Sequence, residues 1–143
     1  MRGFSAEAFA NARRRRGLGV GDLARLADVG TSTIHAWEAG RFTPQIDLLA
    51  RIMQILDTPI SEVVTVAADE RFPGDWRVIR GLTQPQLAAA ARISTSTLRA
   101  IERAELKLTD ANAATLAKLL GINVDDYRAA YQRARERPPG TPV

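Results

Sequence analysis

The side chains with the most obvious chemistry in this chain are its arginines. Among 20 basic residues only Lys107 and Lys118 are lysines, and the rest are arginines. A guanidinium group stays protonated and makes planar, forked contacts with phosphate. Catalytic and metal-binding side chains are scarce, because the chain has no cysteine and a single histidine, His35. These counts exclude disulfide scaffolds, cysteine nucleophiles, thiolate metal sites and multi-histidine sites.

The composition also argues against an enzyme and against a membrane protein. One histidine and scattered carboxylates supply no set of nucleophile, base and orienting residue, so we expect neither enzyme activity nor a cofactor. The longest uncharged apolar run is far shorter than the ~18 residues of a membrane span. Hydrophobic residues make up 45% of the chain and charged residues 25%, which is typical of a globular protein. The net charge of +4 is compatible with a polyanionic partner.

The chain repeats itself at an offset of 64 residues. Ten of the 24 positions in 17–40 are identical to their counterparts in 81–104. The clearest shared segment is Thr31-Ser32-Thr33, which recurs as Thr95-Ser96-Thr97. An ungapped register of this length predicts two small domains. We expect a first domain at 1–66, a linker at 67–72, a second domain at 73–137 with an extended C-terminal helix, and a flexible tail at 138–143.

Each copy is predicted to be a string of five short helices, without a sheet. In the first copy, Ser5 caps a helix that reaches Arg16, and Pro44 and Pro59 open the fourth and fifth helices. Glycines or other turn residues separate the second helix, 20–27, from the third, which ends at Gly40. In the second copy the expected helix starts are the capping box of Thr83 with Gln86, and the caps Ser94, Asp110 and Asn123.

Two short helices joined by a tight turn inside a small bundle form a helix-turn-helix unit. Both copies resemble the lambda-repressor/Cro-type (xenobiotic-response-element) helix-turn-helix family. The resemblance implies an all-α fold of two consecutive five-helix domains. In the second copy it rests on Gly81-Leu82-Thr83-Gln84, Leu87-Ala88, Ile93-Ser94, Thr97-Leu98 and Glu102, and in the first on Gly17-Leu18, Leu23-Ala24, Val29, Thr33-Ile34 and Trp37-Glu38-Ala39-Gly40.

The resemblance implies that helices 31–39 and 95–103 lie in the major groove of double-stranded DNA. The residues then expected at base edges include Arg99, which can bind guanine, short hydroxyls that can bind bases or phosphates, and Ala36 and Ala100. Arginine and glutamate are expected to pair within each copy. The base-contacting candidates are Thr31, Ser32, Thr33, His35, Thr95, Ser96, Thr97 and Arg99; the phosphate-contacting candidates are Gln84, Arg41 and Arg103; the structural ion pairs are Arg13–Glu38 and Arg77–Glu102.

Two functions remain open at this point. The first is a sequence-specific, repressor-like transcriptional regulator of bacterial or phage type, in the cytoplasm and associated with the nucleoid. The second is an adaptor or antitoxin-like module in which only one copy binds DNA and the other binds a protein partner. Partner copies are also open: the chain could act as an intramolecular pseudo-dimer, or could form a homodimer through Val124, Tyr127, Tyr131 and Ala134 of the last helix.

Overall fold

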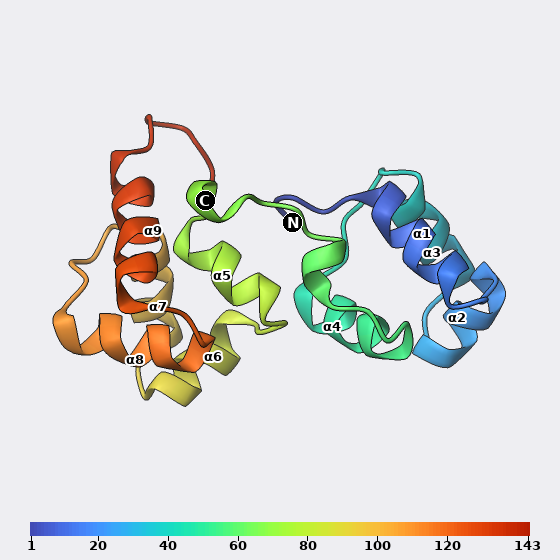
Figure 1. Cartoon of the computed structure of the whole chain (residues 1–143), viewed down its shortest axis with the longest axis horizontal. Helices are drawn as coiled ribbons and strands as arrows, with labels where there is room; N and C mark the ends of the chain where they lie inside the picture. Colours follow the sequence, from blue (N-terminus) through green and yellow to red (C-terminus); the bar gives the residue numbers. More distant parts are fainter. The chain divides into compact units, whose positions relative to one another are not determined.

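The computed structural model describes all 143 residues, and its regular structure is helical throughout. Nine α-helices and two short 3-10 helices form two compact units, Met1–Thr65 and Val66–Val143 (Figure 1). The predicted all-α fold class is therefore confirmed. The one pairing of extended chain is an isolated antiparallel bridge between Phe4 and Val64, inside the first unit.

The first unit contains four α-helices and a 3-10 helix. Ser5 caps the first helix by accepting a hydrogen bond from the Ala8 amide. The expected fifth α-helix is a single 3-10 turn, because Val63 and Val64 leave the helical path to pair with the N-terminal segment. The fourth helix begins after Gln45, not at Pro44. In chain order the elements are α1 (Ala6–Arg15), α2 (Val20–Ala27), α3 (Thr31–Glu38), α4 (Ile46–Ile55) and η1 (Ile60–Glu62).

The second unit repeats this arrangement and adds a long final helix. The capping box of Thr83 with Gln86 and the cap at Ser94 form as predicted. The cap of the fourth helix is Thr109; Asp110 follows it in the first turn. The elements are η2 (Ala68–Glu70), α5 (Pro73–Ile79), α6 (Gln84–Ala91), α7 (Thr95–Glu102), α8 (Asp110–Leu120) and α9 (Val124–Glu136).

Residues 67–72, the expected linker, include η2 and are held by the second unit. The Arg133 guanidinium of α9 donates to the carbonyls of Ala68 and Arg71, at 3.3 and 2.8 Å. The Arg71 guanidinium in turn lies 4.3 Å from the centroid of the Trp76 ring, a cation–π contact. These residues therefore form a fixed first turn of the second unit in the structure.

The repeat extends to backbone conformation. Outside the chain ends, every residue with a left-handed φ has a counterpart 64 positions away that is also left-handed. Glycine is the residue that adopts this conformation without strain, yet only the first pair is glycine in both copies. The four pairs are Gly17/Gly81, Asp28/Arg92, Gly40/Ala104 and Asp57/Gly121.

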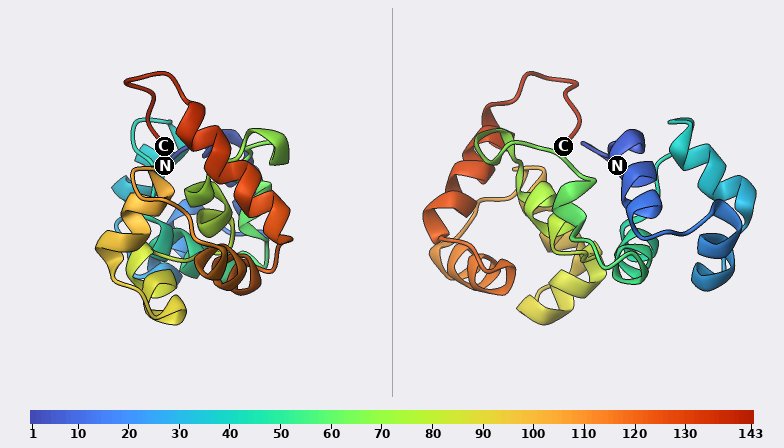
Figure 2. Two further views of the ribbon diagram at one scale, coloured as in Figure 1. Left: turned by 90° about the vertical axis from the view of Figure 1, so that its left-hand side faces the viewer. Right: turned by 45° about the vertical axis from the view of Figure 1, so that its right-hand side comes forward.

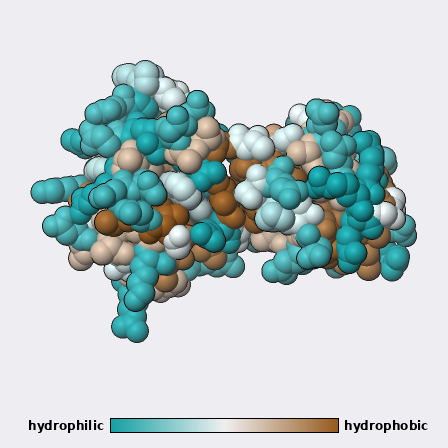
Figure 3. Space-filling model, viewed as in Figure 1, coloured by the Kyte–Doolittle hydropathy of each residue, from teal (hydrophilic) through white to brown (hydrophobic).

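The cores of the two units are separate sets of buried side chains. In the first unit Phe9 meets Trp37 edge to face, with ring centroids 6.0 Å apart. In the second unit α9 packs on α5, α7 and α8 (Figure 2). Hydrophilic residues predominate on the visible face of each unit (Figure 3).

The stripe of α9 that could have formed a dimer is largely used inside its own unit. Tyr127 and Ala134 are fully buried there, and Tyr127 belongs to the same core cluster as Leu116 and Leu120. A homodimer through this stripe is therefore not supported, because its central side chains already pack on their own domain.

Candidate functional site

An ion pair anchors the third helix of the first unit. Arg13 donates from Nε and Nη2 to the two carboxylate oxygens of Glu38, both at 2.7 Å, and from Nη1 to the Leu18 carbonyl at 2.9 Å. Both side chains are nearly buried. The hydrogen bond to Glu38 raises the pKa of Arg13, and this outweighs the opposite effect of burial. The pair thus joins α1, the loop before α2 and the last residue of α3.

The second unit has the same anchor 64 residues later, with one addition. Arg77 donates to the Glu102 carboxylate at 2.8 and 3.0 Å and to the Leu82 carbonyl at 2.9 Å. The amide of Gln84 also donates to Glu102, at 2.9 Å. Gln84, expected at a phosphate, is therefore engaged in this internal network. The first unit has Val20 at the equivalent position and cannot form that bond.

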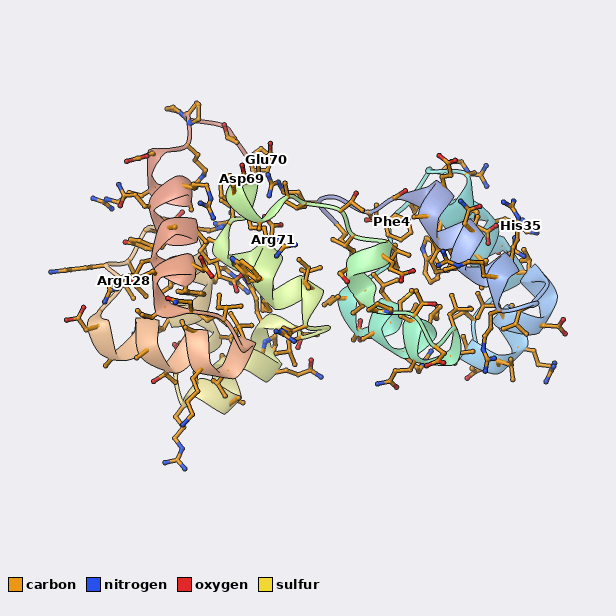
Figure 4. The ribbon with its side chains drawn as sticks, viewed as in Figure 1. Phe4, His35, Asp69, Glu70, Arg71 and Arg128 are labelled. Carbon is orange, nitrogen blue, oxygen red and sulfur yellow. The ribbon has the colours of Figure 1, made fainter.

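Helix α3 of the first unit presents short polar side chains to solvent. Thr31, Ser32 and His35 are exposed, and Thr33 is half-buried. Figure 4 shows His35 on the outer side of its unit. Ala36, which we expected beside the base edges, is buried in the domain, so it offers no surface to a partner. Three of the four candidate side chains on this helix are therefore exposed to solvent.

Helix α7 of the second unit presents a different surface. Ser94 caps it and also donates its hydroxyl to Oγ1 of Thr97, at 2.8 Å, so this threonine hydroxyl takes part in the cap. Thr95 is half-buried, whereas Ser96 and Arg99 are exposed. Arg99 is the longest polar side chain on the exposed side of the helix. Among the exposed side chains of this helix, Arg99 therefore offers the most hydrogen-bond donors.

The two arginines expected near phosphates follow the third helices and are both exposed. Arg41 lies three residues beyond α3. Arg103 is the C-cap of α7 and forms a loose ion pair with Glu105 at 3.9 Å, with both side chains more than half exposed. Such an exposed pair contributes at most about 1 kcal/mol, so Arg103 can exchange Glu105 for another anion at little cost.

Helix α9 braces the loop that follows α7, and sequence reasoning did not find this contact. Two of its side chains and that of its C-cap residue donate to the carbonyl groups of residues 103, 104 and 106, over separations of 25 to 34 residues. No pattern in the chain marks such a pairing, because any tyrosine or arginine could serve. The bonds run from Tyr131 to Leu106 at 2.9 Å, from Arg135 to Ala104 at 3.5 Å and from Arg137 to Arg103 at 2.8 Å.

Two polar atoms are buried near the anchor of the second unit without a hydrogen-bond partner, the Trp76 indole nitrogen and the Tyr127 hydroxyl. Burial raises the pKa of the Tyr127 phenol well above its ordinary value, and the charge of Glu102 raises it further. The first unit has Ala12 and Val63 at these positions. At these two positions the second core thus contains aromatic rings and unpaired polar atoms, whereas the first core contains small aliphatic side chains.

The accessible groups are suited to hydrogen bonding with an anionic partner. Exposed hydroxyls lie on both α3 and α7, and α7 adds the guanidinium of Arg99. Each of these helices is joined at its last residue to the rest of its unit by a nearly buried ion pair. No group of three or more histidine, aspartate or glutamate side chains is placed to hold a metal ion. No helix is long and apolar enough to cross a membrane.

Each unit matches a known protein family over most of its length. Residues 6–65 match a family described as "Helix-turn-helix domain", and residues 75–127 match one described as "Helix-turn-helix". The two matches begin at α1 and α5 and include both anchoring ion pairs. None of the curated proteins matches the chain.

Proposed function

Because the chain consists of two helix-turn-helix domains in tandem, the second of lambda-repressor/Cro type, we propose that it is a sequence-specific regulator of transcription that binds double-stranded DNA. Helices α3 and α7 are the recognition helices, and each enters the major groove with its N-terminal turns toward the bases. The observation that supports this most strongly is the repeated anchor: the same three-bond arginine contact holds the end of an exposed helix in both units.

The side chains assigned to DNA follow from their exposure. Arg99 reads a base, with guanine as its preferred partner through O6 and N7. The shorter side chains that contact bases or phosphates are Thr31, Ser32, His35 and Ser96. Phosphates are contacted by Arg41 and Arg103. Smaller contributions come from the half-buried or internally bonded Thr33, Thr95, Thr97 and Gln84. Repression follows in this proposal from occupying a promoter.

A second function is favoured by a specific difference between the units. The network of Gln84 with Glu102, and the α9 brace, exist only in the second unit. An adaptor in which one helix-turn-helix domain binds DNA and the other binds a protein would use such unequal domains.

Selection of bound duplexes from a random pool tests the proposal. A regulator of the proposed kind enriches a defined sequence, and its affinity falls with salt at a log–log slope that reflects several phosphate contacts. Enrichment of one half-site indicates DNA reading by one domain, and enrichment of two half-sites indicates reading by both. No affinity for any duplex at low salt would rule out both functions.

A further inference from the structure

The two helix-turn-helix segments, residues 17–43 and 81–107, carry very different exposed charge. In the first segment two exposed arginines, Arg25 and Arg41, are balanced by the exposed Asp22 and Asp28. Arg25 lies 3.7 Å from Asp22, so part of its charge is already paired. The charge of Glu38 is paired with Arg13 in the anchor. The first segment therefore offers a partner no net charge.

The second segment is strongly positive over the same length. Its exposed basic residues are Arg92, Arg99, Arg103 and Lys107, and Glu105 is its one exposed acid. The buried carboxylate of this segment belongs to the anchor, as in the first unit. Three positive charges therefore remain on the second segment.

The difference arises at matched positions, so it is not an effect of fold. Asp28 and Arg92 occupy the same left-handed turn between the two helices of the motif. One helical turn into the next helix, His35 stands in the first copy and Arg99 in the second, and both are exposed. These matched positions thus carry an aspartate and a histidine in the first copy and an arginine in the second.

The loop after the recognition helix is also held more firmly in the second unit. Two α9 side chains and that of the C-cap Arg137 bond to its carbonyls, whereas the first unit ends in the short η1 and has no such helix. In the first unit the equivalent loop receives a hydrogen bond from the N-terminal ammonium group to Thr43. A loop that is already ordered loses less entropy when it meets a phosphate backbone.

We propose that the second domain supplies most of the chain's affinity for DNA phosphates, through Arg92, Arg103 and Lys107 beside the base-reading Arg99, and that the first helix-turn-helix segment supplies little. This inference rests on the proposed DNA-binding function. Duplex DNA carries one negative charge per ~1.7 Å of helix axis, so net charge on the docking segment controls the electrostatic part of binding.

The expected size of the effect follows from counterion release. Each neutralised phosphate contributes about −0.9 to the slope of log affinity against log salt. Loss of two phosphate contacts should flatten the slope by about 1.8. If the variant and the unaltered chain bind equally at 1 M salt, a slope difference of about 1.8 makes the variant bind about 60-fold more weakly at 0.1 M.

The test compares the DNA affinity of two matched double variants of the full chain. Both are measured on one duplex enriched from the random pool, or on a generic duplex if no sequence is enriched. Arg92→Gln with Arg103→Gln removes two exposed charges from the second segment and leaves the base-reading Arg99 in place. Arg25→Gln with Arg41→Gln removes two from the first. Glutamine keeps most of the side-chain length and has a helix propensity close to that of arginine. Circular dichroism melting verifies that each variant is folded.

We expect the second-domain variant to lose about 60-fold in affinity at 0.1 M salt, and the first-domain variant to lose at most about eightfold, the value for the single phosphate contact of Arg41. Equal losses, or a larger loss in the first-domain variant, would overturn the assignment while leaving the chain a DNA-binding protein. If the unaltered chain binds no duplex at low salt, the proposed function itself is wrong. The three results are distinct, because only the last concerns the unaltered chain.

Discussion

Removing Arg77 should destabilise the second domain through the charge it leaves behind. This arginine donates two hydrogen bonds to Glu102 and a third to the Leu82 carbonyl, and the two charged side chains are only 12% and 5% exposed. In Arg77→Met the apolar stem is retained, but Glu102 keeps only the amide of Gln84 as a side-chain donor. The carboxylate would then be buried without a compensating cation.

The magnitude follows from burial. Breaking a buried ion pair by removing one partner costs about 3–5 kcal/mol, and the residual exposure of this pair favours the lower end. For a domain of this size, 1 kcal/mol shifts the melting temperature by about 4–8 °C, so a loss of about 3 kcal/mol predicts a shift of about 12–24 °C. Replacing Glu102 with methionine as well should recover part of the loss, because no unpaired charge then remains.

Differential scanning calorimetry and urea unfolding of the full chain measure this loss. The matched control is Glu62→Gln, which breaks the ion pair with Arg15 in the first domain. That pair has nearly the same N–O distance, 2.7 Å, but its side chains are 62% and 48% exposed, so the expected cost is below about 1 kcal/mol. A loss for Arg77→Met no larger than that of the control would refute the argument from burial.

Three further changes have defined outcomes. Tyr127→Phe should leave stability near pH 7 unchanged or raised, because it removes an unpartnered buried hydroxyl. Because the folded-state pKa of Tyr127 is raised, the unaltered domain should lose stability as pH rises above ~10, where the unfolded phenol ionises. Urea unfolding across that range should show a weaker pH dependence in the variant, and an equal dependence would contradict this account. Tyr131→Phe should cost about 0.5–1.5 kcal/mol and speed amide exchange in 103–106; unchanged exchange would argue against the brace. Gly21→Ala should add about 0.5–1 kcal/mol in thermal melts, since this exposed position inside α2 has open space for a methyl group; a loss would indicate an unseen clash.

Helix starts were predictable where a side chain supplies the missing hydrogen bond. Ser5, Thr83 and Ser94 cap their helices as expected, because a hydroxyl three residues before a free amide is visible in the sequence. The 3-10 turn at Ile60–Glu62 was not predictable, since it depends on pairing of the next residues with the N-terminal segment. Thr109 and Asp110 are both good caps, and only the backbone path shows that the threonine is used.

The candidate site was predictable in position more than in detail. The sequence placed the exposed residues on the right helices, because the repeat and the motif give their register. The internal bonds of Gln84 and Thr97 were missed, since a polar side chain that fits a phosphate also fits a neighbouring carboxylate or hydroxyl. The burial of Ala36 was missed as well, because alanine is compatible with either side of a helix.

The sequence by itself determined the repeat, the helical class and the type of motif, because these depend on local hydrogen bonding, helical periodicity and a register of 64 residues. The tertiary structure decided which polar groups remain free. It engages Gln84 and Thr97 in internal hydrogen bonds and places α9 against the loop after α7. The physical reason is that a side chain's availability depends on partners brought close by packing, which separation along the chain does not reveal.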